Sequence, residues 1–492
     1  MKLDFERNPK DAEKDCFERA ALSRIQVHMK HVVWIKAAAL AVIAFSFTGY
    51  PSAARADLNA IFTNTPARVA IPRRASIIFI QCDGLGIGDL SCYGQRKFQT
   101  PNIDRLAAEG IRLTSYYAGS GASSPARAAL LTGMDSRHLR QRADAEIPLG
   151  PDQITVAQVL KDSGYQTDLI GEWILGDENS AGAPWKKGFD SFSGYFDPAD
   201  AANFYCDYVW RYAPAALYDS TNKTWSDFIG HEMIYNNTKA DKSVFIPGLF
   251  STAIINFARV HVPDQRNQYR PFFILVDFKL PGDSQHLRLP TDAPYSEESW
   301  SQADKYRAAA VTRLDNYVGE LLDGLEKYRM TNNVAIFLSS DTGPQSTNIF
   351  ETTPGFRGHR GELYEGALRV PMIVRWPLRI PAGKTSDLPC AAWDFLPTAA
   401  EIASTKTPEN LDGISFLPAL TGEAQTNRHQ ALFWQLNGRE PVSAAYVDGW
   451  KAIQSADGKQ EVYDLKSDPA ERKPLQNSEK TSEFTELLKT KS

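Results

Sequence analysis

Short, uninterrupted runs of apolar residues recur along the chain, and between them apolar residues repeat at helical spacing. Continuous apolar runs of strand length are typical of strands buried on both faces of a parallel sheet. We therefore expect strands at 75–81, 167–171, 271–278, 334–339 and 370–376.

The helical repeat is clearest at 303–328, where Ala310, Leu314, Val318 and Leu325 fall on one stripe. We expect further helices at 102–110, 128–131, 155–163, 244–262 and 394–403. Strands that alternate with helices predict an α/β fold, in which helices flank a large, predominantly parallel mixed sheet.

Two regions depart from this pattern. Residues 177–241 are rich in Trp, Tyr, Asp and Gly with weak periodicity, and we expect an irregular stretch that shapes a substrate mouth. Beyond residue 422, short apolar segments at 431–434, 444–447 and 451–454 are separated by turns. This indicates a main domain at 74–423 and a small C-terminal antiparallel-sheet subdomain at 424–492.

The N-terminal region is typical of an export signal. Basic residues after Met29 precede an apolar run at 37–47 and the small-x-small triplet Ala54-Arg55-Ala56. We expect residues 1–56 to be an upstream segment and signal peptide, with cleavage after Ala56. The polar segment before Met29 is unusual for a signal peptide, and a start at Met29 is one explanation of it. The run is too short to span a bilayer, so we expect a periplasmic or secreted protein without a stable membrane span. A buried helix is the alternative.

Composition narrows the class of function. The 492-residue chain carries a formal charge of −5 and no Lys/Arg-rich block, which argues against nucleic acid as a partner. Its five cysteines show neither a zinc pattern nor a disulfide framework. Cys16 would be lost on processing, and we expect the remaining four to be mostly buried free thiols.

The candidate chemistry centres on residues 123–133, where Ser123, Pro125 and Arg127 follow the order nucleophile-x-Pro-x-Arg. Proline suits the first turn of a helix, because its missing N–H has no helical partner there. The free N–H groups of a helix start favour an anion, and Arg127 adds a fixed fork of donors. An ordinary capped helix start, with Ser123 as an unmodified cap, is the alternative.

Carboxylates follow two of the predicted strands. Asp83 comes directly after the run at 75–81, and Asp341 follows the run at 334–339. The carboxyl ends of central strands are where open α/β sheets bind ligands. We therefore expect both aspartates, each at a strand end, to be candidate ligands, and turn-forming or capping carboxylates are the alternative.

The Ser-x-Pro-x-Arg stretch resembles the signature of the type I sulfatases of the alkaline-phosphatase superfamily. Further segments in the family's order extend from about Ser76 to about Leu475. They are Gly86-Ile87-Gly88-Asp89-Leu90, Thr100-Pro101-Asn102-Ile103-Asp104-Arg105-Leu106, Ser340-Asp341-Thr342-Gly343, Tyr364-Glu365-Gly366-Ala367-Leu368-Arg369-Val370-Pro371, Asp412-Gly413, Tyr463-Asp464-Leu465 and Asp468-Pro469.

The resemblance implies hydrolysis of sulfate esters, of the arylsulfatase or carbohydrate sulfatase type. It implies a maturase that oxidises Ser123 to formylglycine, and calcium held by Asp83, Asp341 and Thr342. Arg127 and Arg360 would complete the catalytic site, and the substrate would be a sulfated small molecule or glycan.

Several positions depart from the family's pattern. Gly84 stands in place of the second metal aspartate, Thr342 in place of an asparagine, and Glu172 in place of a lysine. Ile174 and Gly282 stand in place of two histidines. Losing one general acid or base costs about 10²- to 10⁴-fold in rate, so these departures indicate a degenerate site.

Three hypotheses follow. The chain is a sulfate ester hydrolase with a substitute proton donor such as His286 or His359, or a pseudo-sulfatase that binds a glycan or a protein. In the second case, aromatic residues between Trp185 and Tyr212 would stack on sugar rings. Hydrolysis of phosphate esters or phosphonates is the third hypothesis and fits poorly, because that chemistry generally needs more metal ligands.

Overall fold

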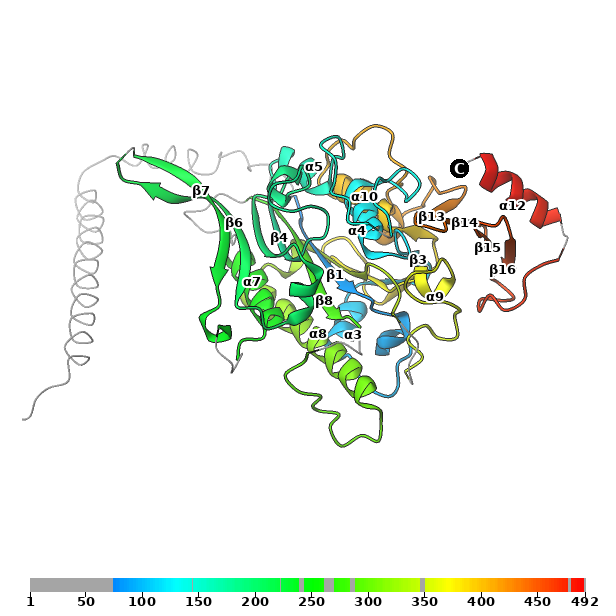
Figure 1. The fold of residues 1–492 in the computed structure, drawn as a ribbon, viewed down its shortest axis with the longest axis horizontal. Helices are drawn as coiled ribbons and strands as arrows, with labels where there is room; N and C mark the ends of the chain where they lie inside the picture. Colours follow the sequence, from blue (N-terminus) through cyan, green and yellow to red (C-terminus); the bar gives the residue numbers. More distant parts are fainter. Residues whose placement is uncertain are drawn as a thin grey trace, which may run out of the picture. The chain divides into compact units, whose positions relative to one another are not determined.

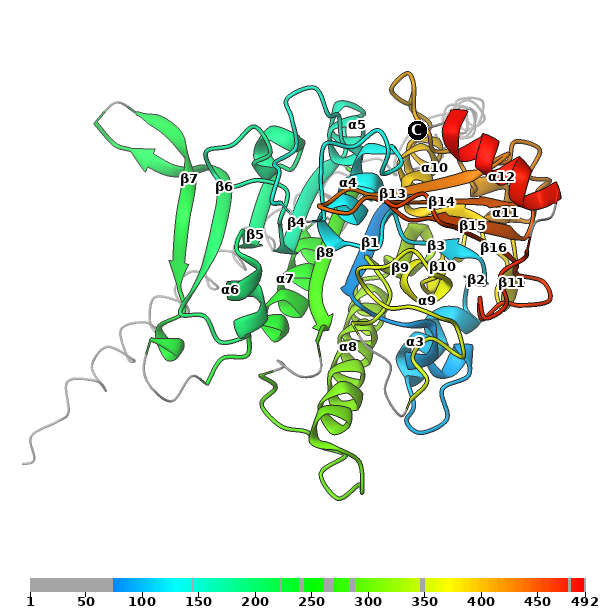
Figure 2. The same cartoon turned by 45° about the vertical axis from the view of Figure 1, so that its right-hand side comes forward.

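A computed structural model describes residues 74–490, except residues 144, 222, 239–242, 261–269, 284–287, 346–349 and 477–478. A ten-stranded sheet forms the centre of the described part, in the order β11-β2-β10-β9-β1-β8-β4-β5-β6-β7 (Figures 1 and 2). Its strands are β1 (Ser76–Asp83), β2 (Ile111–Leu113), β4 (Gln166–Glu172), β5 (Ser191–Tyr195), β6 (Tyr208–Asp219), β7 (Thr224–Met233), β8 (Phe272–Pro281), β9 (Val334–Ser340), β10 (Met372–Arg375) and β11 (Lys384–Ser386).

The five central strands, β9, β1, β8, β4 and β5, run parallel to one another. β10 and β6 join them antiparallel on either side. The prediction of a predominantly parallel mixed sheet is therefore confirmed. The five strands predicted from apolar runs correspond to β1, β4, β8, β9 and β10.

Helices cover both faces of this sheet. The described α-helices are α3 (Pro101–Ala108), α4 (Ser123–Thr132), α5 (Val156–Asp162), α6 (Pro198–Asn203), α7 (Ile246–Val260), α8 (Gln302–Lys327), α9 (Glu365–Leu368), α10 (Phe395–Ile402), α11 (Leu417–Thr421) and α12 (Glu479–Thr490). Short 3-10 helices are η2 (Ile87–Asp89), η3 (Ser91–Tyr93), η4 (Pro184–Lys187), η5 (Tyr235–Asn237), η6 (Thr331–Asn333) and η7 (Ala392–Asp394).

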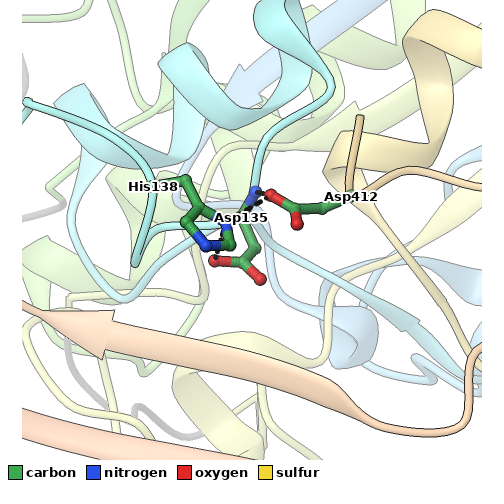
Figure 3. A group of neighbouring side chains, drawn as sticks. All are labelled: Asp135, His138 and Asp412. Atoms are coloured by element: carbon green, nitrogen blue, oxygen red, sulfur yellow. Dashed lines mark hydrogen bonds and ion pairs between the residues drawn. The ribbon is translucent and has the colours of Figure 1, made fainter. Parts of the chain in front are cut away.

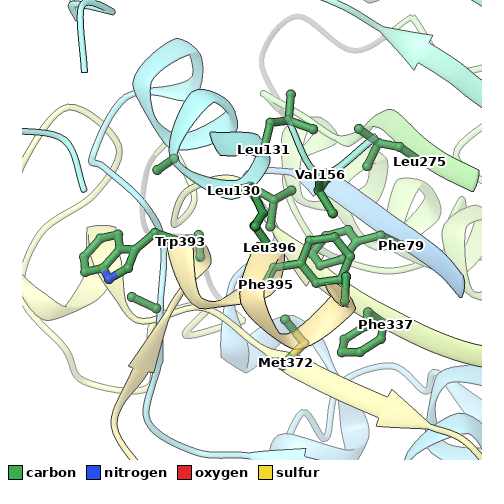
Figure 4. Close-up of a cluster of buried hydrophobic side chains, with 14 of the residues drawn as sticks. Phe79, Leu130, Leu131, Val156, Leu275, Phe337, Met372, Trp393, Phe395 and Leu396 are labelled. Carbon is green, nitrogen blue, oxygen red and sulfur yellow. The ribbon is translucent and has the colours of Figure 1, made fainter. Parts of the chain in front are cut away.

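Side-chain alternation along β1 separates two hydrophobic layers. Ile77 and Phe79 belong to the layer under α4, α5 and α10, where Phe79 contacts Phe395 at 4.5 Å between ring centroids (Figure 4). Ile78 and Ile80 belong to the layer under α3, α7 and α8. Burial on both faces explains why these strands read as continuous apolar runs.

The expectation of an irregular stretch at 177–241 is wrong, because this region forms β5 and the long hairpin β6–β7 at the edge of the sheet (Figure 2). Trp225, Ile229 and Met233 of β7 are exposed. A strand that is exposed to solvent on both faces does not show the apolar alternation of a half-buried strand, so its sequence gives no period-two pattern. The aromatic residues of this hairpin are typical of strands even where that pattern is absent.

The C-terminal part forms an antiparallel sheet of β13 (Leu432–Leu436), β14 (Val442–Val447), β15 (Trp450–Gln454) and β16 (Gln460–Asp464). α12 packs on it through Phe484 and Leu488, which share a small core with Phe433. The small antiparallel subdomain was predicted, whereas β16 and α12 were not. A pair of two-residue strands, β3 (Tyr116–Tyr117) and β12 (Cys390–Ala391), lies outside both sheets.

Cys82, Cys92, Cys206 and Cys390 are free thiols, and only Cys92 is not fully buried, which confirms that prediction. No helix in the described ranges is long and apolar enough to cross a membrane. The predicted signal segment and Cys16 lie outside the described residues.

Candidate active site

Asp83 and Asp341 meet at the carboxyl ends of two neighbouring strands, as expected. Asp83 is the last residue of β1 and Asp341 follows β9 directly. The Asp341 N–H donates to the Cys82 carbonyl at 2.9 Å, and the Gly84 N–H donates to Asp341 Oδ1 at 3.2 Å. Both carboxylates are buried.

Ser123 is the first residue of α4, and Arg127 lies one turn further on. The residue before the helix is Ala122, which makes no side-chain capping bond, so the alternative of Ser123 as the helix cap is wrong. Ser123 remains partly accessible, whereas Pro125 and Arg127 are buried. α4 thus carries the predicted nucleophile and the predicted arginine on the same helix start.

The guanidinium of Arg127 is surrounded by carboxylates of the protein. Its Nη2 lies 2.5 Å from Glu172 Oε2, 3.2 Å from Asp277 Oδ1 and 3.5 Å from Asp341 Oδ2. Glu172 ends β4, and Asp277 lies on the adjacent β8. One guanidinium nitrogen, Nη2, therefore lies against three buried acids, whereas the equally buried Nε and Nη1 have no hydrogen-bond partner among the described residues.

Two further cations lie on the aspartates. Lys279 of β8 places its Nζ 2.7 Å from Asp83 Oδ2 and 2.9 Å from Glu172 Oε1. Arg360 bonds Asp83 Oδ1 through Nη2, which also lies 3.4 Å from Asp341 Oδ1. Its Nε donates to Thr342 Oγ1 at 2.9 Å.

Sequence reasoning missed Asp277 and Lys279 as members of this site. The available signal was a pair of charged residues at the end of an otherwise apolar strand, Phe272–Pro281. A charge in a buried strand is rarely tolerated without a partner. The predicted residues Asp83, Arg127, Asp341, Thr342 and Arg360 are all brought together with this pair.

The protonation states follow from these contacts. Burial alone would raise the pKa of the Asp83 carboxyl, but Arg360 and Lys279 hold it well below its usual range. Burial likewise opposes ionisation of Glu172, but Arg127 and Lys279 lower its pKa. Burial raises the pKa of Asp277 well above its usual value although Arg127 lies close, and this favours the protonated form.

The residues present do not fit the calcium ion that the family resemblance implies. Both oxygens of Asp83 are bound by nitrogen donors, and the Thr342 hydroxyl accepts from Arg360. Gly84 supplies no side chain, and a Cβ there would lie 3.1 Å from Arg360 Nη2. Four buried carboxylate oxygens of the site have no hydrogen-bond partner in the described part of the chain, namely Asp83 Oδ2, Glu172 Oε2, Asp277 Oδ1 and Asp341 Oδ2. Each lies within 3.5 Å of a nitrogen of Lys279 or Arg127, whereas a hard cation needs oxygen ligands that are not already paired with a cation.

The two histidine positions hold no proton-transfer group. Ile174 follows β4, and Gly282 donates its N–H to the Asp83 carbonyl at 2.9 Å. Of the substitutes considered, His359 is exposed and its Nδ1 lies 3.0 Å from the Arg360 carbonyl. His286 lies outside the described residues.

A second group of ionisable side chains lies after α4, where Asp135, His138 and Asp412 converge (Figure 3). His138 Nδ1 lies 2.8 Å from Asp412 Oδ2, which also accepts the Asp135 N–H at 2.9 Å. The Asp135 carboxylate is bound by Arg137, with Nη2 at 2.5 Å from Oδ2. These bonds fix the loop after α4 to the segment around Asp412.

Two family models match the chain. The family model described as "Sulfatase" matches residues 75–405, and the model described as "N-sulphoglucosamine sulphohydrolase, C-terminal" matches residues 358–492.

Individual relatives point the same way. Human arylsulfatase A is 30% identical over 380 residues, which cover 75% of this chain and 72% of the relative. N-acetylgalactosamine-6-O-sulfatase of Bacteroides thetaiotaomicron is 26% identical, with coverage of 85% and 93%. A solved structure in complex with its substrate D-glucosamine-2-N,6-O-disulfate matches with a TM-score of 0.65 at 22% identity, covering 85% of this chain and 98% of that chain.

Proposed function

The chain belongs to the sulfatase family, and from that premise we propose that it is a pseudo-sulfatase that binds a glycan and does not hydrolyse sulfate esters. The closure of Arg127 by Glu172, Asp277 and Asp341 carries this proposal. Sulfatases share a site built to receive an anionic ester, and here three buried carboxylates lie around Nη2 of the guanidinium.

Electrostatics explains why this arrangement opposes hydrolysis. An ester sulfate that approached Arg127 would meet Glu172 at close range. Two unit charges about 4 Å apart repel by roughly 1 to 4 kcal/mol between the dielectric of water and that near a protein surface. Displacing Glu172 would also leave Lys279 without one of its two carboxylate partners.

The chain's own residues offer little of the required acid–base chemistry. Ser123 is a weak nucleophile without an adjacent base, and formylglycine, if formed there, would supply the aldehyde hydrate that attacks sulfur in the family. Ile174 and Gly282 leave no side chain at the two histidine positions to move a proton. Lys279 is held between two carboxylates and not presented to a leaving group.

Exposed aromatic side chains support glycan binding as the remaining role. Trp225 and Tyr235 are 63% and 76% exposed, at opposite ends of β7. Ile229 and Met233 share the Trp225 face of the strand and are also exposed. From Trp225 to Met233 this row extends about 26 Å, at about 3.3 Å per residue, which suits an extended sugar chain.

Export is the accompanying proposal for location. It rests on the basic residues after Met29, the apolar run at 37–47 and the triplet ending at Ala56. Sequencing the N-terminus of the protein recovered outside the cytoplasm tests it. A mature chain that begins at Asp57 is expected, and an uncleaved chain retained in the cytoplasm contradicts it.

The retained signature favours a second candidate, a sulfate ester hydrolase with reduced activity. Ser123, Pro125 and Arg127 keep the maturase pattern, and Arg360 keeps a positive charge at the position of the family's lysine. Arginine keeps the positive charge of lysine, and its planar guanidinium can bind two sulfate oxygens at once.

One experiment separates the two candidates. The chain is produced together with a serine-type formylglycine maturase and assayed on nitrocatechol sulfate and sulfated hexosamines, with Ser123→Ala as the background. We expect equal rates for both proteins. Turnover above the Ser123→Ala background contradicts the proposal and supports the hydrolase.

The binding half is tested on an array of sulfated and neutral glycans. We expect binding that persists in Ser123→Ala and falls at least tenfold in Trp225→Ala. Leu378→Ala is the matched control, because Leu378 is 60% exposed and lies outside the β6–β7 hairpin. Absence of binding to every glycan, or equal loss in both variants, contradicts a glycan-binding surface on the hairpin.

A further inference from the structure

We propose that Lys279 and Arg360 replace the divalent cation of this fold, so that two side-chain cations of the protein perform the structural role of a bound metal. The inference concerns the cation side of the site, and it holds whether or not the site turns over an ester.

The geometry around Asp83 supports this replacement. Each of its two oxygens has its own cation, Lys279 Nζ at 2.7 Å from Oδ2 and Arg360 Nη2 on Oδ1. Arg360 Nη2 also reaches Asp341 Oδ1 at 3.4 Å. The two aspartates that the fold brings together at adjacent strand ends are thus bridged by a guanidinium.

Burial indicates where these cations lie. The Asp83 and Asp341 side chains are fully buried, whereas the Lys279 and Arg360 side chains are each 20% exposed. The two cations therefore reach solvent, whereas the carboxylates that they contact do not.

The charge balance is consistent with a divalent ion's role. Lys279 and Arg360 together carry two positive charges beside Asp83, of which the charge at position 360 is also present as a lysine in the sulfatase pattern. A buried carboxylate without a partner is strongly unfavourable, so Asp83 requires compensation in either form. Gly84 has φ +66°, which L side chains rarely adopt, and a Cβ there would lie 3.1 Å from Arg360 Nη2, so the present backbone disfavours a carboxylate at this position.

Glu172 acts as the positioning residue for Lys279. Its Oε1 lies 2.9 Å from Lys279 Nζ, and its Oε2 lies 2.5 Å from Arg127 Nη2. Lys279 is therefore held from β4 on one side and from β1 on the other, and the three strands β1, β8 and β4 are neighbours in the sheet. The acid that opposes an ester anion thereby helps to hold the substitute cation.

Thermal unfolding and calorimetry test the proposal on the full mature chain. We expect the melting temperature of the wild type to change by less than about 1 °C between EDTA and 5 mM calcium or magnesium, since neither ion binds the native state. In Lys279→Met we expect a lower melting temperature that calcium raises by more than about 3 °C. Titration calorimetry should show one calcium ion per chain for this variant and none for the wild type.

Two further variants make the outcome decisive. Lys279→Met with Glu172→Gln keeps the net charge and serves if Lys279→Met does not fold. Lys451→Met is the control, because Lys451 is a buried lysine between Glu365 and Glu471, each at 3.0 Å, and Arg369 remains near Glu365. It should lose stability without recovery by calcium.

Three results overturn the proposal. One is a wild type that binds calcium or is stabilised by it. Another is a folded Lys279→Met or Lys279→Met/Glu172→Gln variant that shows no calcium response. The last is an equal calcium response in Lys451→Met, which would show that calcium binds wherever a buried lysine is removed from between two carboxylates.

Discussion

Lys279 and Glu172 form a partly buried ion pair of 2.9 Å between the carboxyl ends of the adjacent strands β8 and β4. The sulfatase pattern places a lysine at position 172, where this chain has the acid, and Lys279 on the next strand carries the positive charge. The lysine now faces Asp83 at 2.7 Å. A charge that would contact the substrate's anion in the family is therefore used to neutralise the protein's own carboxylates.

Glu172→Gln should be among the most destabilising single changes at this site. It removes the acid that pairs with both Arg127 and Lys279, and both cations are then left with less compensation in a buried setting. Breaking one partner of a buried pair costs about 3 to 5 kcal/mol. The free energy of unfolding, measured by urea denaturation at neutral pH, should fall by that amount.

The matched control is Glu232→Gln. Glu232 pairs with Arg211 at 2.6 Å, but its side chain is 49% exposed, and exposed pairs contribute about 1 kcal/mol or less. Equal losses in the two variants would show that the buried network does not stabilise the fold.

The central sheet could be predicted because its strands are buried on both faces. Residues 75–81 and 334–339 read as continuous apolar runs for that reason, and they became β1 and β9. The hairpin β6–β7 could not be predicted in the same way. Its residues are largely exposed, so neither face imposes an apolar pattern on the sequence.

Only those parts of the site that depend on local sequence, such as residues at strand ends, could be predicted. Asp83 and Asp341 stand at strand ends, so their meeting follows from a parallel sheet. Lys279 was missed because its role depends on two partners, Asp83 and Glu172, which lie 196 and 107 positions away in the sequence. No local pattern records such a contact.

Ser123 should be oxidised by a serine-type maturase even though the site is closed. Pro125 and Arg127 complete the motif that resembles a maturase substrate. Peptide mass spectrometry across Ser123 should show a loss of two hydrogens. An unmodified serine, in cells that convert a known sulfatase, would contradict this and would remove the family's nucleophile.

Asp168 should make the protein less stable as pH rises towards 7. Burial raises the pKa of this carboxyl to about 7, although it accepts a hydrogen bond from Ser191 at 2.6 Å. In the unfolded chain it ionises near 3.9, so between about pH 4 and 7 the native state binds the extra proton. Its contribution to stability is therefore present at low pH and is lost through this window, by up to roughly 4 kcal/mol.

Asp168→Asn isolates this effect, because the amide keeps a similar shape and does not titrate. We expect the variant to match or fall below the wild type at pH 4.5 and to exceed it at pH 8, with unfolding by urea as the measurement. A difference between the two proteins that stays constant across this range would contradict the shifted ionisation.

The charge swap Glu172→Lys/Lys279→Glu should fail to restore stability. An isolated ion pair keeps its attraction when the acid and the base exchange places. This pair, however, lies between two further charged residues, Arg127 and Asp83. The lysine introduced at position 172 would lie beside Arg127, whose Nη2 is 2.5 Å from Glu172 Oε2 in the wild type. The glutamate introduced at position 279 would lie beside Asp83, whose Oδ2 is 2.7 Å from Lys279 Nζ in the wild type. Two like-charge contacts replace two ion pairs, so the double variant should be no more stable than the less stable single variant.

Urea denaturation of the wild type, the two single variants and the double variant gives the coupling free energy between positions 172 and 279. If the double variant instead recovered the stability of the wild type, the attraction between positions 172 and 279 would be independent of their neighbours. Arg127 and Asp83 would then not determine which strand carries the acid and which carries the lysine.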